Sequence, residues 1–434
     1  MPANHSNAAL LVAALVAACG SKPTTPPAPS APPAAPHDEA TVAVAAPVPD
    51  AGAIAVDSPP IVAPRAGADF IDEARWLFRI AGCGDGPLPT PFAGDPDRAA
   101  TYQRVIDQHC KAIAPDVAKF REVYFVNAPA WLDAHVPADV PSSVVYPFGG
   151  GDLLSALAAF RSATEITTIS LELAGDPRRV ADVTAPQLAA DLARFRNEIA
   201  WLIRFGSNTS VNLSAQQRNH LPGQTSSFLL ALAIGGYEPV AMRYFTIDDQ
   251  GAIHYLEKSE IEADTKSTKS LGSGWRDPNF AESFRNVEIS YRKVGEASIR
   301  THRHIAWNLD NKHLKERPGL LRQVEAKGKV AIIVKGASYL LWQREFATIR
   351  TYILDHLAFM LSDSTGIPPM YAGPAGMVQE AYGRYVRAGL PHAAGSQQDY
   401  EMRQLWKNPA GPAPFRFGYV DGASNHHLLI TRPK

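Results

Sequence analysis

A tract rich in proline and alanine, from Gly20 to about Ala68, most limits how this chain folds. It contains repeated Pro, Ala, Ser, Thr and Val and almost no aromatic residue. Such a segment buries too little apolar surface to offset the entropy lost on ordering, and its prolines favour an extended conformation. We therefore expect residues 19–68 to be a disordered tether, and the folded part to begin near Asp69.

An apolar run over residues 8–18 precedes this tract and stops at Cys19. The run is about half as long as the roughly 20 residues of a membrane-spanning helix, and its length matches the apolar core of a secretory signal. The stretch from Val16 to Cys19 resembles the lipobox of bacterial lipoproteins. The resemblance implies a signal peptide over residues 1–18 and a lipid on Cys19. Because Gly20 rather than Asp follows, it also implies the outer membrane, facing the periplasm or the cell surface.

The charge balance excludes one broad class of partner. The 42 Lys and Arg residues almost equal the 43 Asp and Glu residues in number, so no basic excess is present to bind nucleic acid. Contact with the membrane is expected through the lipid anchor. Beyond it, a small polar ligand or an envelope protein remains open as a partner.

Two cysteines, Cys83 and Cys110, remain when Cys19 is set aside. No Cys/His motif surrounds either residue, which argues against a catalytic thiol. In an oxidising compartment the two are expected to form a structural disulfide.

The periodicity of apolar residues predicts an α/β fold. Residues 69–140 are mainly helical in pattern, whereas residues 141–434 alternate strand-like and helical segments. We expect a Rossmann-like, three-layer mixed sheet with β-hairpin additions and an N-terminal helical region. The expected helices cover residues 68–79, 102–113, 115–136 with a turn, 152–160, 184–206, 226–237, 314–326 and 346–360. The expected hairpins are 238–256, 286–307 and 414–420 with 427–432, and residues 330–334 are expected to form a buried strand. Thr184 and Gln187 predict the cap of the helix over 184–206, whose core face carries Leu188, Leu192, Phe195, Ile199 and Leu202.

A glycine-rich turn gives the most specific chemical motif. The sequence VVYPFGGGDLLSALAAF places Gly149, Gly150 and Gly151 between a predicted strand and a helix, and Glu172 ends the next strand about 20 residues later. The pattern resembles the first two motifs of class I S-adenosylmethionine-dependent methyltransferases. The resemblance implies a ligand at the glycines, Asp152 and Glu172.

Two features oppose a nucleotide cofactor at this turn. Tyr146 stands where those methyltransferases usually carry an acid, and Asp152 stands where a glycine is usual. An exported protein also lacks access to cofactors kept inside the cell, so we expect none. The alternative is a tight strand-to-helix turn in which Asp152 caps the helix.

Histidines form a second cluster, in the sequence THRHIAWNLDNKH. His302 and His304 share one face of a predicted strand and could meet a metal with Asp310 or His313. The opposite face carries Ile305 and other apolar residues. Because the spacing is common by chance, we expect solvated histidines and no metal site. The adjacent pair 426–427 is discounted in the same way, since neighbouring residues on a strand point to opposite faces.

Motifs of common hydrolases are absent from the sequence, including the serine-hydrolase elbow and the zinc-protease motif. Catalytic residues therefore remain unknown. Some polar residues lie where they could line a cleft or end an element: Ser226, Ser227, Lys335, Ser338, Tyr339, Asp363, Ser364 and Gly366.

Residues 146–172, 334–354 and 361–371 together are similar to a family of exported bacterial proteins without an assigned activity. The resemblance implies a shared α/β fold and no reaction. The sequence thus predicts a lipid-anchored envelope protein with a binding or accessory role. A transferase or hydrolase that uses the glycine-loop cleft is the alternative.

Overall fold

The computed structural model describes residues 67–205, 220–264, 281–386, 395–418 and 426–434. They belong to one compact unit, Val62–Lys434. The predicted signal peptide, Cys19 and nearly all of the predicted tether lie outside the described residues.

Within the described ranges, no helix combines the length and the apolar character that crossing a bilayer requires.

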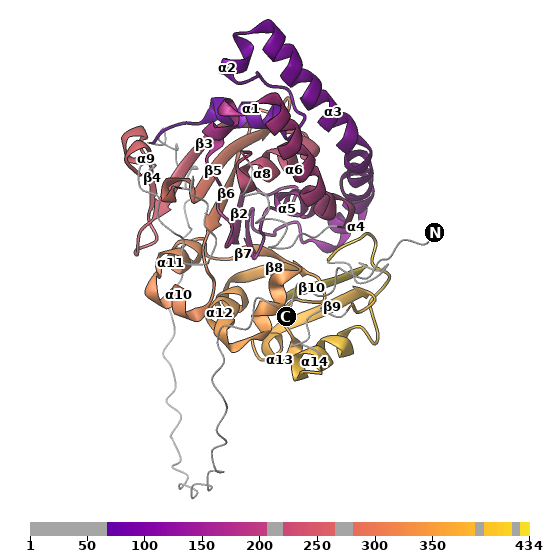
Figure 1. Ribbon diagram of the computed structural model, residues 1–434. Helices are drawn as coiled ribbons and strands as arrows, with labels where there is room; N and C mark the ends of the chain where they lie inside the picture. The colour runs from indigo at the N-terminus through magenta and orange to yellow at the C-terminus, as the bar shows by residue number, and fades with distance from the viewer. Residues whose placement is uncertain (1–66, 206–219, 265–280, 387–394, 419–425) are drawn as a thin grey trace, which may run out of the picture. The chain divides into compact units, whose positions relative to one another are not determined.

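A ten-stranded mixed sheet forms the centre of the unit (Figure 1). Its order is β4-β3-β5-β6-β2-β1-β7-β8-β10-β9. The five strands from β6 to β8 are parallel, and antiparallel strands extend the sheet at both ends. The strands are β1 Ser143–Pro147, β2 Glu165–Ser170, β3 Tyr237–Ile247, β4 Ile253–Tyr255, β5 Asn286–Lys293, β6 Ile299–Ala306, β7 Val330–Val334, β8 Leu357–Ser362, β9 Met377–Gly383 and β10 His427–Pro433. The structure is therefore a mixed α/β fold, as expected.

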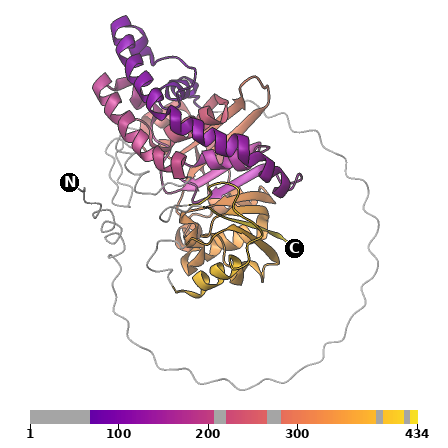
Figure 2. The ribbon, with the colours of Figure 1, turned by 90° about the vertical axis from the view of Figure 1, so that its right-hand side faces the viewer.

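The helices that precede β3 in the chain and the helices α10 to α12 lie on different sides of the sheet (Figures 1 and 2). Side chains of α1, α3, α5, α6 and α8 share one apolar core, and those of α10, α11 and α12 share a second. The helices are α1 Ile71–Ile80, α2 Thr90–Ala93, α3 Pro96–Arg121, α4 Ala128–His135, α5 Leu153–Ala159, α6 Ala185–Phe205, α8 Gly223–Gly235, α9 Lys258–Asp264, α10 Asn311–Glu316, α11 Gly319–Glu325, α12 Ala347–His356, α13 Pro369–Ala372 and α14 Gln397–Leu405.

The long helix α6 begins as its sequence predicts. Thr184 and Gln187 form a capping box, in which the Thr184 backbone N–H donates to Gln187 Oε1 over 2.8 Å. The Gln187 N–H donates in return to Thr184 Oγ1 over 3.4 Å. The predicted apolar face is buried throughout, at Leu188, Leu192, Phe195, Ile199 and Leu202.

The N-terminal helices belong to the same unit as the sheet. The Phe70 N–H donates to the carbonyl of Met242 in β3 over 2.7 Å, which ties the start of α1 to the sheet. Cys83 and Cys110 form the expected disulfide, with their Cα atoms 5.6 Å apart. This bond links the segment after α1 to α3.

The prediction of one helix over residues 346–360 was wrong in its second half. The helix α12 ends at His356, and Leu357 begins β8. The segment Leu357–Ser362 is almost entirely buried, and a short, wholly apolar run fits a buried strand as well as a helix face. Periodicity therefore could not find this boundary.

Proline breaks the helix that was predicted over residues 314–326. The helix α10 ends at Glu316, and α11 begins at Gly319 after Pro318. Proline lacks the backbone N–H that would continue the ladder, and it restrains the residue before it.

The predicted C-terminal hairpin was also wrong. The strand β10 pairs with β8 on one side and β9 on the other, and both pairs are antiparallel. The described part of residues 414–420 makes a single parallel bridge, Phe417 with His426. The strand β9 was not predicted from the sequence, because its residues 379 and 380 are polar and only partly buried.

Candidate functional site

The order of the parallel strands reverses between β1 and β7. From β1 the chain continues to β2 on one side, whereas β7 and then β8 lie on the other side. In open α/β sheets, ligand sites lie outside the carboxyl ends of strands at such a reversal. The loops that follow β1, β7 and β8 are therefore the place to look for a site.

A buried ion pair joins two of these loops. Asp152 follows β1, and Lys335 follows β7 directly; their Oδ2 and Nζ atoms are 2.8 Å apart. Both side chains are almost fully buried, with 5% and 3% of their surface exposed. Removing two charges from water is costly, so the attraction between them and further hydrogen bonds must compensate.

Neighbouring groups supply those hydrogen bonds. The Tyr146 hydroxyl donates to Asp152 Oδ2 over 3.0 Å, and the Ser155 N–H donates to Asp152 Oδ1 over 2.9 Å. Lys335 Nζ donates to Ser155 Oγ over 2.5 Å. Burial, followed by the charge of Asp152, raises the pKa of Tyr146 well above its ordinary value, so its phenol remains a donor.

A second buried carboxylate holds the next loop against this cluster. Asp363 Oδ2 accepts the Gly336 N–H over 2.8 Å, and Asp363 Oδ1 accepts the Thr365 N–H over 2.8 Å. Asp363 is fully buried. These bonds join the loop after β7 to the loop after β8, so Lys335 is held on a rigid backbone.

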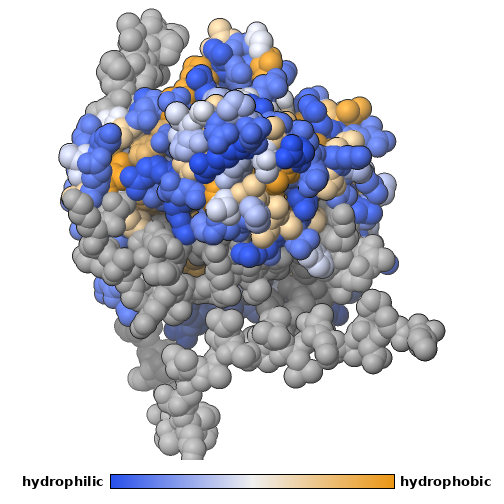
Figure 3. All heavy atoms as spheres, turned by 45° about the horizontal axis from the view of Figure 1, so that its top comes forward, coloured by the Kyte–Doolittle hydropathy of each residue, from blue (hydrophilic) through white to orange (hydrophobic). Residues whose placement is uncertain are grey.

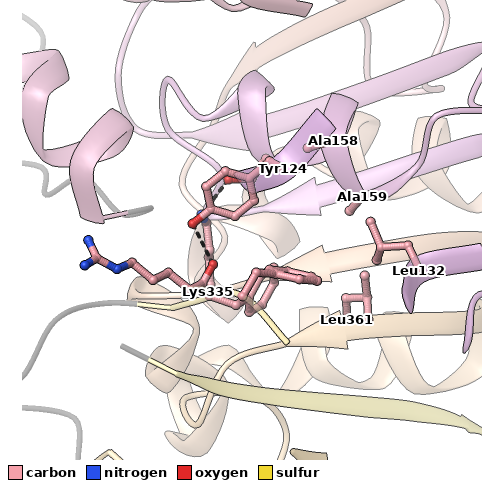
Figure 4. A pocket seen from close by; sticks show the side chains of 10 residues that line it. Tyr124, Leu132, Ala158, Ala159, Lys335 and Leu361 are labelled. Carbon is pink, nitrogen blue, oxygen red and sulfur yellow. Dashed lines mark hydrogen bonds between the residues drawn. The ribbon is translucent and has the colours of Figure 1, made fainter. Parts of the chain in front are cut away.

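A narrow slot opens beside Lys335 (Figure 4). Tyr124, Ser155 and Lys335 contribute polar groups to it. Its volume is about 320 Å³ with the open mouth included, although only about 10 Å³ of this has room for a water molecule. The remaining lining residues are Leu132, Ala158, Ala159, Leu361, Phe415, Arg416 and Phe417.

A π-helical turn, Glu122–Asn127, places Tyr124 at the slot. Such turns are rare and are often found at functional sites. The Tyr124 hydroxyl donates to the carbonyl of Arg416 over 2.6 Å, which ties the turn to the C-terminal segment (Figure 4). Burial, followed by the charge of Asp152, raises the pKa of Tyr124.

The predicted glycine loop lies against α8. The Gly149 N–H donates to the carbonyl of Ile169 over 3.0 Å, and Gly150 has a positive φ of 51°. A Cβ atom on Gly151 would lie 2.5 Å from Gln224 Oε1. The absence of a side chain thus lets α8 approach the loop closely. Asp152 caps α5 through the Ser155 N–H, as one of the two interpretations of the sequence required.

Glu172 is buried just beyond β2. Its carbonyl oxygen accepts a hydrogen bond from His304 Nε2 over 2.7 Å. The sequence predicted that Asp152 and Glu172 hold a ligand together. In the structure, Asp152 forms an ion pair with Lys335, which was named from the sequence only as a residue that could line a cleft.

The prediction that His302 and His304 are solvated was wrong, because both are fully buried. The helix α8 covers their face of β6, and the Phe228 ring lies 4.4 Å from His302 and 5.0 Å from His304. The two do share one strand face, as predicted. Their exposure depended on what packs against that face, which the strand pattern does not show.

The hydrogen bonds of this pair determine which ring nitrogens carry hydrogen. His304 Nε2 donates to the Glu172 carbonyl, so His304 Nδ1 accepts from the Thr168 hydroxyl over 3.1 Å. The Thr168 oxygen then accepts from His302 Nε2 over 3.0 Å. Within the described ranges, His302 Nδ1 has no hydrogen-bond partner. Burial lowers the pKa of His304 to about 4 and that of His302 well below its ordinary value.

The other polar residues named from the sequence have local roles. Ser226 Oγ donates to the Pro222 carbonyl in the first turn of α8. Ser338 bonds Thr365, and the Ser364 N–H donates to His427 Nδ1. Burial raises the pKa of Tyr339. Gly366 closes a turn on Asp363, which follows a strand rather than a helix.

In the part of the chain that the structure describes, no three His, Cys, Asp or Glu side chains are grouped to hold a metal ion. Asp310 and His313 interact with each other at 2.8 Å on α10.

Three polar residues of the slot were not predicted from the sequence. Ser155 could have been found as the third residue after a cap. Tyr124 and Arg416 could not, because a π-helical turn and a contact across almost three hundred residues bring them together.

The chain was compared with protein-family models, with curated proteins and with solved structures, and no match was found in any of the three.

Proposed function

We propose that this protein is an exported, lipid-anchored binding protein that holds a small ligand in the slot beside Lys335. The hydrogen bond from Lys335 to Ser155 carries the proposal. A serine that acts as a nucleophile needs a base that accepts its proton. Here the lysine donates to the serine and faces the Asp152 carboxylate, so the pair suits recognition better than acyl transfer.

Export is supported by two independent features. The lipobox-like stretch before Cys19 comes from the sequence, and the Cys83–Cys110 disulfide comes from the folded unit. Structural disulfides persist mainly outside the reducing cytosol. An anchor at the outer membrane, with a tether of about 50 residues, would hold the binding unit away from the lipid.

Export is tested by labelling producing cells with radioactive palmitate. We expect label in the wild-type chain and none in Cys19→Ala, with Cys83→Ala as a control that keeps the label. Recovery of an unlabelled, full-length precursor from the cytosol would contradict the anchor.

Binding is tested by native mass spectrometry of protein extracted from its own envelope in mild detergent. We expect an added small-molecule mass on the wild type that Ala158→Leu loses, because Ala158 lines the slot. Ala190→Leu makes the same change on the exposed face of α6 and should keep the mass. Equal adducts, or none, on all three proteins would contradict the proposal.

A transferase is the second candidate, and the strand order favours it. Numbered along the chain, the parallel strands read 3-2-1-4-5, the order of Rossmann-like nucleotide-binding sheets with helices on both faces. Glycines follow the first strand, and Glu172 follows the second. A fold can be kept while its chemistry is lost, so the order alone does not assign an activity.

Calorimetry with S-adenosylhomocysteine separates the two candidates. Under the leading proposal, we expect no saturable heat at S-adenosylhomocysteine concentrations up to about 1 mM, which is the upper end of ordinary KM values. Saturable binding that Glu172→Gln weakens would favour the transferase.

A further inference from the structure

Two arginines are fixed at the carboxyl end of β6, a strand that β2 separates from β1. Arg285 Nε donates to the carbonyl of Ala306, the last residue of β6, over 2.9 Å. The guanidinium carbon of Arg317 lies 4.2 Å from the ring centre of Trp307, the next residue along the chain. Consecutive residues at the end of one strand therefore hold both guanidinium groups at the same edge of the sheet.

Both groups keep N–H donors that the described contacts do not use. The Trp307 ring covers one face of the Arg317 guanidinium, and such stacking leaves the N–H groups at the edge of the plane. Arg285 uses Nε for Ala306 and Nη1 for Glu282, while its Nη2 makes no hydrogen bond to a described residue. Two arginines with donors at their edges suit an oxyanion, which can accept several such bonds at once.

The charges around Arg317 also favour an anion. Glu282 pairs with Arg285 at 2.9 Å, whereas Arg317 has no carboxylate within ion-pair distance among the described residues. Burial lowers the pKa of Arg317, and the charge of Arg285 lowers it further. Glu282 and Asp249 act in the opposite direction. Arg322 donates to the carbonyl of Asp249 over 2.8 Å, so three guanidinium groups share two carboxylates here. A partly desolvated guanidinium beside another one is stabilised by a negative ligand.

We propose that Arg285 and Arg317 bind a phosphate dianion at the carboxyl end of β6, either as free phosphate or as the end of a phosphate monoester. A dianion carries a charge for each guanidinium, and the planar fork of arginine matches phosphate oxygens in pairs. A carboxylate has one charge and two oxygens, so it satisfies one arginine only. This site is separate from the slot beside Lys335, and it does not depend on a ligand there.

Calorimetry on the full-length protein tests the site with three probes: inorganic phosphate, glycerol phosphate and acetate, at a pH where phosphate is mainly a dianion. We expect saturable heat with both phosphates and at least tenfold weaker binding of acetate, because hydrogen bonds between charged groups are the stronger ones. Tighter binding of glycerol phosphate would support a monoester as the ligand, and tighter binding of inorganic phosphate would support the free ion. No saturable heat with either phosphate, or equal affinity for acetate, would overturn the proposal.

Variants locate the binding. Arg317→Gln removes a charge without breaking a described ion pair, and it should weaken phosphate binding about tenfold. Arg285→Lys keeps the charge but loses the fork, so it should weaken binding less. The control is Arg292→Gln, near the opposite end of β5, where the arginine pairs with Glu238; it should leave binding unchanged.

Arg317→Lys checks the same contact if Arg317→Gln folds poorly, since it keeps the charge and the alkyl stem and should also weaken binding. Phosphate binding that is unchanged in the Arg317 and Arg285 variants would overturn the proposal. An equal loss in Arg292→Gln would also overturn it, because the loss would then follow the net charge of the protein rather than this site.

Discussion

Two lysines with largely covered side chains flank β7, and their surroundings differ. Lys327 precedes the strand and bonds Glu165, while Arg303 bridges Glu165 and Glu288 at 2.6 and 2.7 Å. Lys335 follows the strand and pairs with Asp152 beside a slot. The same residue type thus takes part in a network of several charged side chains at the amino end of the sheet, and in an ion pair with Asp152 and a hydrogen bond to Ser155 at its carboxyl end.

The difference separates a structural tie from a candidate site. At the amino end, charged side chains bridge β2, β5 and β6, and Glu165 keeps 28% of its side chain exposed. Burial alone would raise the pKa of Glu165, but Lys327 and Arg303 outweigh it and lower the pKa. At the carboxyl end, the pair adjoins unfilled space and a serine hydroxyl. A hollow beside buried polar groups is what a ligand site requires.

The coloured part of the surface in Figure 3 is mainly hydrophilic, with scattered apolar residues. Scattered apolar residues of this kind are normal for a folded protein.

The largest expected effect tests the two lysines directly. Lys335→Met should lower the free energy of unfolding by about 3–5 kcal/mol, because it leaves the Asp152 carboxylate buried without its cation. Lys327→Met should cost less than half of that, since Glu165 keeps Arg303 and reaches water. Urea unfolding measures both. Equal losses of unfolding free energy in the two variants would show that the two ends of the sheet do not differ in this way.

A double variant serves as the control. Asp152→Asn combined with Lys335→Met removes both charges and should recover part of the loss, which no simple packing defect would do.

The second prediction concerns pH. Burial holds the pKa of folded His304 at about 4, below its ordinary 6.5, so the unfolded chain binds more protons between these values. Stability from this residue is therefore complete above pH 6.5 and is lost as the pH falls, by about 3 kcal/mol once pH 4 is reached. His302 acts in the same direction.

The amino-end network should respond at lower pH. The lowered pKa of Glu165 gives stability that is present above its ordinary value of 4.5 and is lost below it.

Urea unfolding from pH 8 to 4 measures the effect of His304. The variant His304→Asn should flatten the slope of the free energy of unfolding against pH above pH 4.5, although His109, with a pKa of about 4, keeps part of that slope. An unchanged slope would show that His304 is not buried in its neutral form.

The third prediction concerns the close approach of α8 to the glycine loop. Gly151→Ala should lower the free energy of unfolding by about 1–3 kcal/mol, because the new Cβ meets Gln224 Oε1 at 2.5 Å and Ser227 Cβ at 3.2 Å. Adding Gln224→Ala should relieve much of this loss. Thermal unfolding checks both variants, and a neutral Gly151→Ala would mean that α8 and the loop are not in contact.

The smallest expected effect is a gain in stability. Neither polar atom of the fully buried Gln224 amide has a hydrogen-bond partner among the described residues, so Gln224→Met should raise the free energy of unfolding by about 1 kcal/mol. Tyr291→Phe removes a buried hydroxyl that likewise has no hydrogen-bond partner in the described part of the chain, away from the glycine loop, and is the matched comparison. Destabilisation by Gln224→Met would imply that the amide has a role that the described contacts do not show.

Local sequence rules predicted much of the fold. The capping box at Thr184 and Gln187, the hairpins β3–β4 and β5–β6, and the buried strand β7 all formed as expected. Each depends on neighbouring residues alone. The boundary at Leu357 failed because a buried strand has no polar face for periodicity to reveal.

The candidate site was predicted only in part. Asp152 was identified through the turn that holds it, and Lys335 through the buried strand before it. Their pairing was not predicted, because β1 and β7 are almost two hundred residues apart and meet only through the strand order.

The sequence by itself determined the elements, the caps and the cysteines that could pair, since these follow from spacing and composition. Only the tertiary structure decided that two histidines are buried, that Asp152 neutralises Lys335, and that a slot lies between α5 and Phe415. These depend on which side chains exclude water from one another, a property of packing between distant segments rather than of any one segment.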